Sequence, residues 1–175
     1  MFTAVLGDRP FEAALDHVAS LGAGAVEVAA GGYNVRTLLR LRDAAGPFIA
    51  ANFDPSHLWW QGADPLTVVA ALGDAGALAH VHAKDTELLA DRIARDGVLE
   101  TTPSDRPEDR AWRFRTVGLG HPEPEWAALL GALAAAGYDG TVSVEHEDRL
   151  LEPEEGLARA IGLLLRVSAG GSPAR

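Results

Sequence analysis

The sequence predicts an α/β fold in which strand–helix units stack into a parallel sheet. Helix, glycine turn, apolar strand and terminal acid occur in this order twice, as LGAGAVEV near the start and as AAGYDGTVSVE near the end. Such repetition is typical of βα units with right-handed crossovers. In addition, three short apolar runs close on a side chain that can bind a metal ion, namely Asp54, His82 and Glu145. If the runs are parallel strands, these groups emerge at one edge of the sheet, where α/β barrels build their active sites.

Each element in the first third of the chain has a local signal. Pro10 opens a helix, and Gly22 stops it after the last apolar position. Asn34 has the side chain of an N-cap, and the helix that follows it ends at Gly46. The expected order is a strand at 2–6, a helix from Pro10 to Gly22, a strand at 25–28 and a helix from Asn34 to Gly46.

The remainder continues this alternation around one long polar segment. Asp64 and Pro65 begin a short helix, and an apolar stripe at i, i+3, i+4, i+7 and i+8 from Trp126 marks the clearest helix of the chain. Residues 168–175 are expected to form a frayed tail. The expected order is a strand at 48–53, a helix from Asp64 to about Gly73, a strand at 78–82, a polar segment at 85–122, the helix containing Trp126, a strand at 141–145 and a helix from Pro153.

Five βα units are therefore expected within a single domain at residues 1–167. The chain has 175 residues, of which 47% are hydrophobic and 23% charged, and this suits one globular domain with a real core. A closed (β/α)₈ barrel needs eight strands and usually at least ~200 residues. Either the barrel is incomplete or the sheet is open.

Composition restricts the classes of function. The formal net charge of −10 makes the average surface repel phosphate backbones, so we expect no nucleic acid partner and favour a small polar ligand. The absence of cysteine leaves His, Asp and Glu as the strong metal ligands. No stretch approaches the ~20 apolar residues that span a bilayer, and the N-terminus lacks a basic leader before an apolar run. We therefore expect a cytoplasmic protein without membrane contact.

Four motifs carry a family resemblance: NFDPSHLWWQGADP, HVHAKDTE, WRFRTVGLGHPEPEW and AAGYDGTVSVEHEDRL. In this order they resemble the C-terminal half of the sugar phosphate isomerase/epimerase family, the xylose isomerase-like TIM barrels. The resemblance covers residues 34–167, and the opening segment 6–33 resembles the first two βα units of the same family. Strands three to five are missing between them, with an apparent internal deletion near 33–34. The resemblance thus implies an incomplete TIM barrel.

The resemblance also implies a divalent metal ion, held in this family by Glu, Asp, His and Glu at four strand ends. Asp54, His82 and Glu145 match three of these ligands, and the glutamate that ends strand five has no counterpart. A site of oxygen ligands with one imidazole suits Mn²⁺, Mg²⁺ or Co²⁺, with Zn²⁺ as a further candidate. The resemblance makes Glu145 a catalytic base as well as a ligand. Asp54, which precedes a proline, is alternatively an ordinary turn or cap residue.

Four residues are expected to bind substrate. His57 resembles the substrate-binding histidine of the family, Asp85 lies just past a strand, and Arg115 sits in a segment that could fold over the site. Glu27 is a candidate substitute for the missing glutamate, and otherwise a substrate contact or a packed acid.

Two further residues of the HVHAKDTE motif receive structural interpretations. His80 and His82 are assigned to opposite faces of their strand, so that only one of them looks inward. The resemblance selects His82, and His80 is interpreted as a structural histidine under a helix. Lys84 lies past the strand end, where a substrate contact is plausible and a solvated charge is the ordinary interpretation.

The leading functional hypothesis is a metal-dependent sugar or sugar phosphate isomerase or epimerase, which moves a proton next to a carbonyl through an enediolate. An inosose dehydratase-like lyase of the same family is the enzymatic alternative. Metal-dependent apurinic endonucleases share the fold, but the acidic surface opposes DNA. A third hypothesis is a non-catalytic truncated paralogue that binds metal weakly, or completes its barrel as a homo-oligomer, because the missing strands leave open sheet edges.

Overall fold

The structure is a computed structural model that describes residues 10–22 and 34–170. The chain divides into two units, Met1–Tyr33 and Asn34–Arg175, whose boundary falls at the junction that the sequence analysis placed near 33–34. In the first unit, the described residues form α1 (Phe11–Ser20), which confirms the helix expected there. The predicted strands at 2–6 and 25–28 lie outside the described residues.

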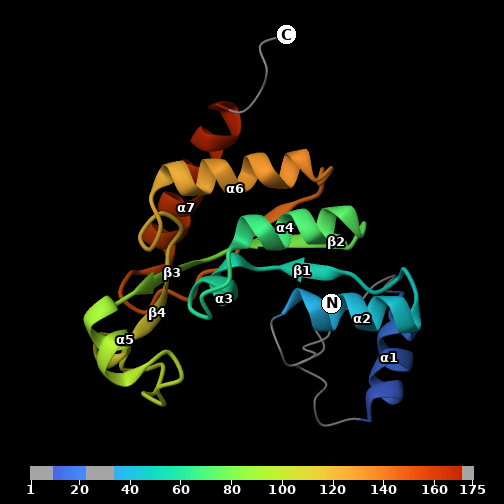
Figure 1. The fold of residues 1–175 in the computed structure, drawn as a ribbon, viewed down its shortest axis with the longest axis horizontal. Helices are drawn as coiled ribbons and strands as arrows, with labels where there is room; N and C mark the ends of the chain where they lie inside the picture. Colours follow the sequence, from blue (N-terminus) through green and yellow to red (C-terminus); the bar gives the residue numbers. More distant parts are fainter. Residues whose placement is uncertain (1–9, 23–33, 171–175) are drawn as a thin grey trace. The chain divides into compact units, whose positions relative to one another are not determined.

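A parallel sheet of three strands organises the second unit (Figure 1). Its order is β1 (Ala51–Phe53), β2 (Leu78–Ala83) and β5 (Val142–Val144), and both pairs of neighbours are parallel. These elements confirm the strands predicted at 48–53, 78–82 and 141–145. Since the strands run in one direction, their carboxyl ends share one edge of the sheet.

Helices α4 (Pro65–Asp74) and α6 (Glu123–Ala135) lie on one side of the sheet in Figure 1. Three of the five positions of the predicted stripe of α6 are buried, and Trp126, Leu129 and Leu133 are each 2% exposed. They pack with α4, with α7 (Pro153–Gly170) and with the buried strand residues in one hydrophobic core. Each such side chain contributes roughly 1.5–3 kcal/mol by leaving water. This core fixes the strand ends that carry the candidate site.

Side-chain capping explains where α4 and one further helix of the second unit begin. The side chain of Asn34 accepts a hydrogen bond from the Thr37 N–H at the start of α2 (Val35–Ala45). Asp64 caps α4 through the N–H groups of Leu66 and Thr67. At the other end of the chain, α7 runs to Gly170, so it continues into the tail expected from residue 168. None of the described helices is long and apolar enough to cross a membrane.

The segment 85–122 is more regular than the sequence analysis expected. It contains an antiparallel pair, β3 (Asp85–Leu88) and β4 (Trp112–Arg115), with α5 (Ala90–Asp96) and the short 3₁₀ helix η2 (Pro107–Asp109) between the two strands. The pair lies beyond the carboxyl end of β2 (Figure 1). Trp112 and Phe114 alternate with Arg113 and Arg115, which is the pattern of a strand with two different faces.

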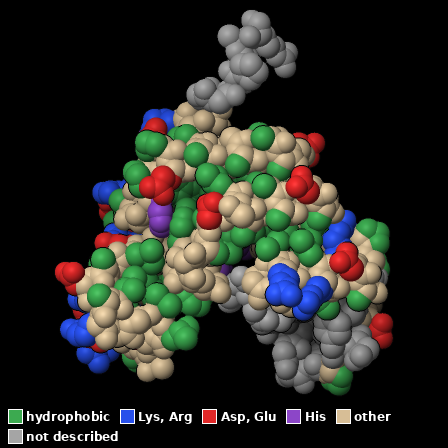
Figure 2. Space-filling view, viewed as in Figure 1, with side chains coloured by type: hydrophobic (Ala, Val, Ile, Leu, Met, Phe, Trp, Pro, Cys, Tyr) green, Lys and Arg blue, Asp and Glu red, His purple; other side chains and the backbone are tan. Residues whose placement is uncertain are grey.

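The described residues contain five strands in two sheets and no closed barrel, which confirms the expected incomplete TIM barrel. Only β1, β2 and β5 are parallel strands of the βα units that the sequence predicted. On the face shown in Figure 2, acidic, basic and hydrophobic side chains are interspersed.

Candidate metal centre

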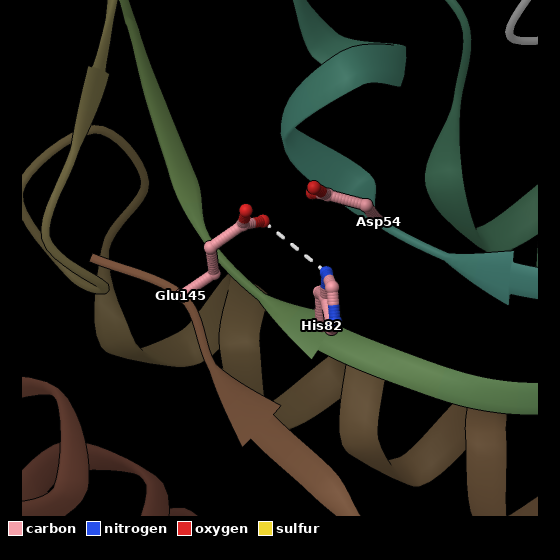
Figure 3. A group of neighbouring side chains, drawn as sticks. All are labelled: Asp54, His82 and Glu145. Carbon is pink, nitrogen blue, oxygen red and sulfur yellow. Dashed lines mark ion pairs between the residues drawn. The ribbon is translucent and has the colours of Figure 1, made fainter. Parts of the chain in front are cut away.

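Three strand ends bring Asp54, His82 and Glu145 together (Figure 3). Asp54 follows β1, His82 lies near the end of β2, and Glu145 follows β5. One ligand atom from each residue lies within 4.8 Å of the other two, and all three side chains point toward a common space. His82 Nδ1 is 3.2 Å from Glu145 Oε2. The structure therefore assembles the three residues that the sequence analysis selected as metal ligands.

Asp54 serves two purposes with its two carboxylate oxygens. Its Oδ1 accepts hydrogen bonds from the N–H and the hydroxyl of Ser56, at 2.9 and 2.7 Å, and so caps α3 (Pro55–Trp59). Its Oδ2 faces the cluster, 3.5 Å from His57 Nε2. The cap role and the proposed ligand role are therefore compatible, because they use different oxygens.

Lys84 is the main site residue that the sequence interpretation missed. Its side chain is 3% exposed, and its ammonium lies 3.1 Å from Asp54 Oδ2, 2.8 Å from Glu145 Oε2 and 2.9 Å from Glu147 Oε2. The ring of Phe114 on β4 lies 4.5 Å from the same ammonium. The expectation of a solvated charge was wrong. Lys84 is two residues beyond His82, and this spacing places both side chains on the same face of an extended chain.

The same rule corrects the interpretation of His80. His80 and His82 do not face opposite sides of β2: their ring centroids are 5.3 Å apart, because residues i and i+2 of a strand share a face. His80 Nε2 lies 2.9 Å from the hydroxyl of Ser143 on β5. The amide nitrogen of Asn52 on β1 lies 3.3 Å from His82 Nε2. Neighbouring strands thus hold each histidine ring in place.

Electrostatic coupling sets the charge states in the cluster. The hydrogen bond with His82, together with the Lys84 ammonium, lowers the pKa of Glu145 to about 2, although burial alone would raise it. Burial lowers the pKa of Lys84, but attraction to Asp54 and hydrogen bonds to Glu145 and Glu147 outweigh it and raise that pKa above its ordinary value. Burial also lowers the pKa of His57, against the opposing effect of Asp54. At neutral pH, Glu145 is ionised and Lys84 is charged.

The four expected substrate contacts have different outcomes. His57 lies in the cluster, and its ring meets the edge of Phe114 with centroids 5.3 Å apart. Arg115 directs its guanidinium to Glu87 and Asp148, at 2.6 and 3.0 Å, so two of its three side-chain nitrogens are already engaged. Glu27 lies outside the described residues.

Asp85 requires a correction. Its side chain is fully buried and faces away from the cluster of Lys84, toward the loop at 118–121. The donors to its two oxygens are the backbone N–H groups of Thr86, Gly118, Gly120 and His121 and the Trp126 indole, while His121 Nδ1 lies 2.7 Å away. Because these donors use its accepting capacity, Asp85 organises the loop, and we do not retain it as a substrate contact.

Comparison with known proteins places the chain in a family. Residues 24–167 match the xylose isomerase-like TIM barrel family. The chain belongs to this family. It is also similar to the uncharacterized protein YfiH of Bacillus subtilis (strain 168), with 41% identity over 132 residues. That alignment covers 75% of this chain and 42% of the relative, so the chain spans less than half of the relative's length.

The donor set in this xylose isomerase-like chain suits a divalent cation. Two carboxylates and one imidazole are hard or intermediate ligands, which Mn²⁺ and similar ions accept. The cluster also contains more negative than positive groups, since three carboxylates surround the single ammonium of Lys84. The residues present therefore fit a metal ion, although the fourth glutamate of the family pattern has no counterpart in the sequence.

Proposed function

We propose that this chain acts as a metal-dependent sugar or sugar phosphate isomerase or epimerase, which transfers a proton next to a carbonyl through an enediolate. The observation that carries the proposal is the convergence of Asp54, His82 and Glu145 at the carboxyl ends of three parallel strands. Sites of this fold class are built at that edge. A cytoplasmic location and a sugar or polyol ligand remain part of the proposal.

Each residue has a proposed task. Asp54, His82 and Glu145 would hold a divalent ion such as Mn²⁺, Mg²⁺ or Co²⁺, and when bound, the ion polarises a carbonyl oxygen. Glu145 would act as the general base that accepts a proton from the adjacent carbon. His57 and Phe114 line the same space, where His57 would contact a sugar hydroxyl and Phe114 would exclude water.

Metal binding is the first test. Calorimetric titration of the folded chain with Mn²⁺ should show one bound ion, and Asp54→Ala and His82→Ala should each abolish the binding. Glu152→Ala is a matched control, because it removes an exposed acid on the segment before α7. A folded wild-type sample that takes up no Mn²⁺ or Co²⁺ would refute the proposed metal centre.

Product analysis tests the reaction itself. Incubation with a panel of ketoses in D₂O should give deuterium on the carbon next to the carbonyl, and Glu145→Gln should remove this exchange. An inosose dehydratase-like reaction uses the same residues, and loss of water from inososes without ketose exchange would favour it.

A non-catalytic role is a second candidate. It is a non-catalytic paralogue that binds metal weakly or completes its sheet with another copy, and the family glutamate without a counterpart in the resemblance supports it. Metal binding without exchange or dehydration, combined with a dimer in sedimentation, would support this candidate.

A further inference from the structure

The position of Lys84 bears directly on metal binding. Its ammonium contacts Asp54 Oδ2 and Glu145 Oε2, which belong to two of the three residues of the candidate metal centre. Its third partner, Glu147, is not one of the three grouped ligands, and the Glu147 side chain is 47% exposed. The structure therefore shows three carboxylates arranged around one cation, and that cation is a lysine.

Lysine and a divalent ion cannot use the shared oxygens independently. Two positive charges a few ångströms apart repel each other, and the 3% exposure of Lys84 leaves little solvent to screen that repulsion. An ion bound by Asp54 and Glu145 would also engage two of the three carboxylates that contact the ammonium, the ion-pair partner Asp54 and the hydrogen-bond acceptor Glu145. Glu147 would remain, and its exposure gives it freedom to move with the lysine.

We propose that Lys84 and the divalent ion compete for Asp54 and Glu145, and that Glu147 retains the displaced ammonium when the ion is bound. Lys84 thus neutralises part of the negative charge of the centre when no ion is bound, and it weakens metal binding. This inference rests on the metal centre of the proposed function. It assigns Glu147 to the lysine and not to the ion.

A double-mutant cycle separates these roles. Lys84→Met should tighten Mn²⁺ binding by at least about tenfold, because it removes the competing charge. Glu147→Gln alone should weaken binding, because Lys84 then has no carboxylate to retain it away from the ion. In the Lys84→Met background, Glu147→Gln should have almost no effect, and this non-additivity is the signature of the proposed coupling.

Matched variants control for charge and size. Arg166→Met removes an exposed positive charge on α7 and should leave the affinity nearly unchanged. Lys84→Arg keeps the charge and should not tighten binding. Unchanged or weaker binding in Lys84→Met would overturn the competition, and a large loss in the Lys84→Met/Glu147→Gln variant would make Glu147 a ligand. If the wild-type chain binds Mn²⁺ but one of these two results is found, the competition is refuted and the proposed function is retained. If neither the wild type nor any variant binds Mn²⁺, the competition and the proposed metal centre are both refuted.

Lys84 is also the only lysine in the sequence, and this permits a direct observation of the wild-type chain. Incorporation of ¹⁵N-lysine labels this one ammonium, so its NMR signal reports the site without substitution. Addition of diamagnetic Mg²⁺ should shift the signal in the wild type and leave it in place in His82→Ala. A signal that does not respond while Mg²⁺ binds would contradict displacement, even where Lys84→Met fails to fold.

Discussion

Lys84 and Asp85 are adjacent buried charges with opposite environments. Lys84 faces three carboxylates, so its surroundings carry more negative charge than it can neutralise. Asp85 faces backbone N–H groups, an indole and the His121 ring, and these neighbours satisfy its oxygens without a second cluster of carboxylates. The excess negative charge around Lys84 allows the cluster to bind a further cation. The complete set of donors around Asp85 instead holds the loop at 118–121 in place. Burial alone therefore does not identify a functional residue.

Removal of Asp85 should give the largest effect on folding. Asp85→Ala leaves the N–H groups of Gly118, Gly120 and His121 and the Trp126 indole without their acceptor inside the protein. Each unsatisfied buried donor costs about 1–3 kcal/mol, so we expect a total loss of at least about 3 kcal/mol. Urea unfolding followed by circular dichroism measures this loss.

Asp105→Ala is the control for Asp85, because Asp105 is an exposed aspartate. It should change the free energy of unfolding by less than about 0.5 kcal/mol. If Asp85→Ala and Asp105→Ala have equal free energies of unfolding, Asp85 does not stabilise the loop more than an exposed aspartate does.

Asp148 provides an intermediate case. Its buried carboxylate accepts hydrogen bonds from Arg115 Nε at 3.0 Å and from the N–H groups of Thr116 and Leu150, both at 2.9 Å. Asp148→Asn keeps the shape but removes the charge opposite Arg115, and we expect a loss of about 1–3 kcal/mol at neutral pH. The expected ranking below Asp85 follows from the smaller number of donors involved.

The pH dependence of the Asp148 effect has a definite sign. Burial raises the pKa of Asp148, but the hydrogen bonds from Thr116 and Leu150 and the Arg115 side chain outweigh it, so the folded pKa lies below the unfolded value of about 3.9. The stabilisation is present above the unfolded pKa and is lost as the pH falls through the folded pKa. Thermal unfolding from pH 7 to pH 2.5 should show the wild type and Asp148→Asn converging below about pH 4. Parallel curves would show that the ionised form is not what stabilises the fold.

The sequence predicted the candidate ligands because each of them ends an apolar run. Parallel pairing then brings Asp54, His82 and Glu145 together without further information. Lys84 was missed because His80 and His82 were assigned to opposite faces, and the correct i+2 relation would have placed Lys84 beside His82. The three candidate ligands were therefore predictable from the sequence. Lys84 would also have been predictable if the i+2 rule for strands had been applied correctly.

Other features depend on contacts that are distant in the sequence. The β3–β4 pair was missed because α5 and η2 separate its two strands and because arginines on β4 make the segment polar. Asp85 could not be recognised as a loop-holding residue, because its donors at 118–121 become visible only after the chain folds. Position just past a strand predicts the edge at which a side chain emerges, but not which group it meets there.

Among Asp85, Asp148 and Asp54, the smallest effect on stability is expected at Asp54, and it completes the contrast with Asp85. Asp54→Asn retains an oxygen for the N–H of Ser56, so α3 keeps its cap. The variant loses one negative charge beside Lys84, but Glu145 and Glu147 remain within 2.8 and 2.9 Å of the ammonium. Because two carboxylates still compensate the ammonium, we expect the free energy of unfolding in metal-free buffer to change by no more than about 1 kcal/mol. Mn²⁺ binding, by contrast, should be lost, and the stabilisation that Mn²⁺ gives to the wild type should disappear with it. Paired unfolding curves with and without Mn²⁺ measure both effects. A loss of 3 kcal/mol or more without metal would place Asp54 with Asp85 among the residues that hold the fold, and the carboxylate excess around Lys84 would then be a structural feature.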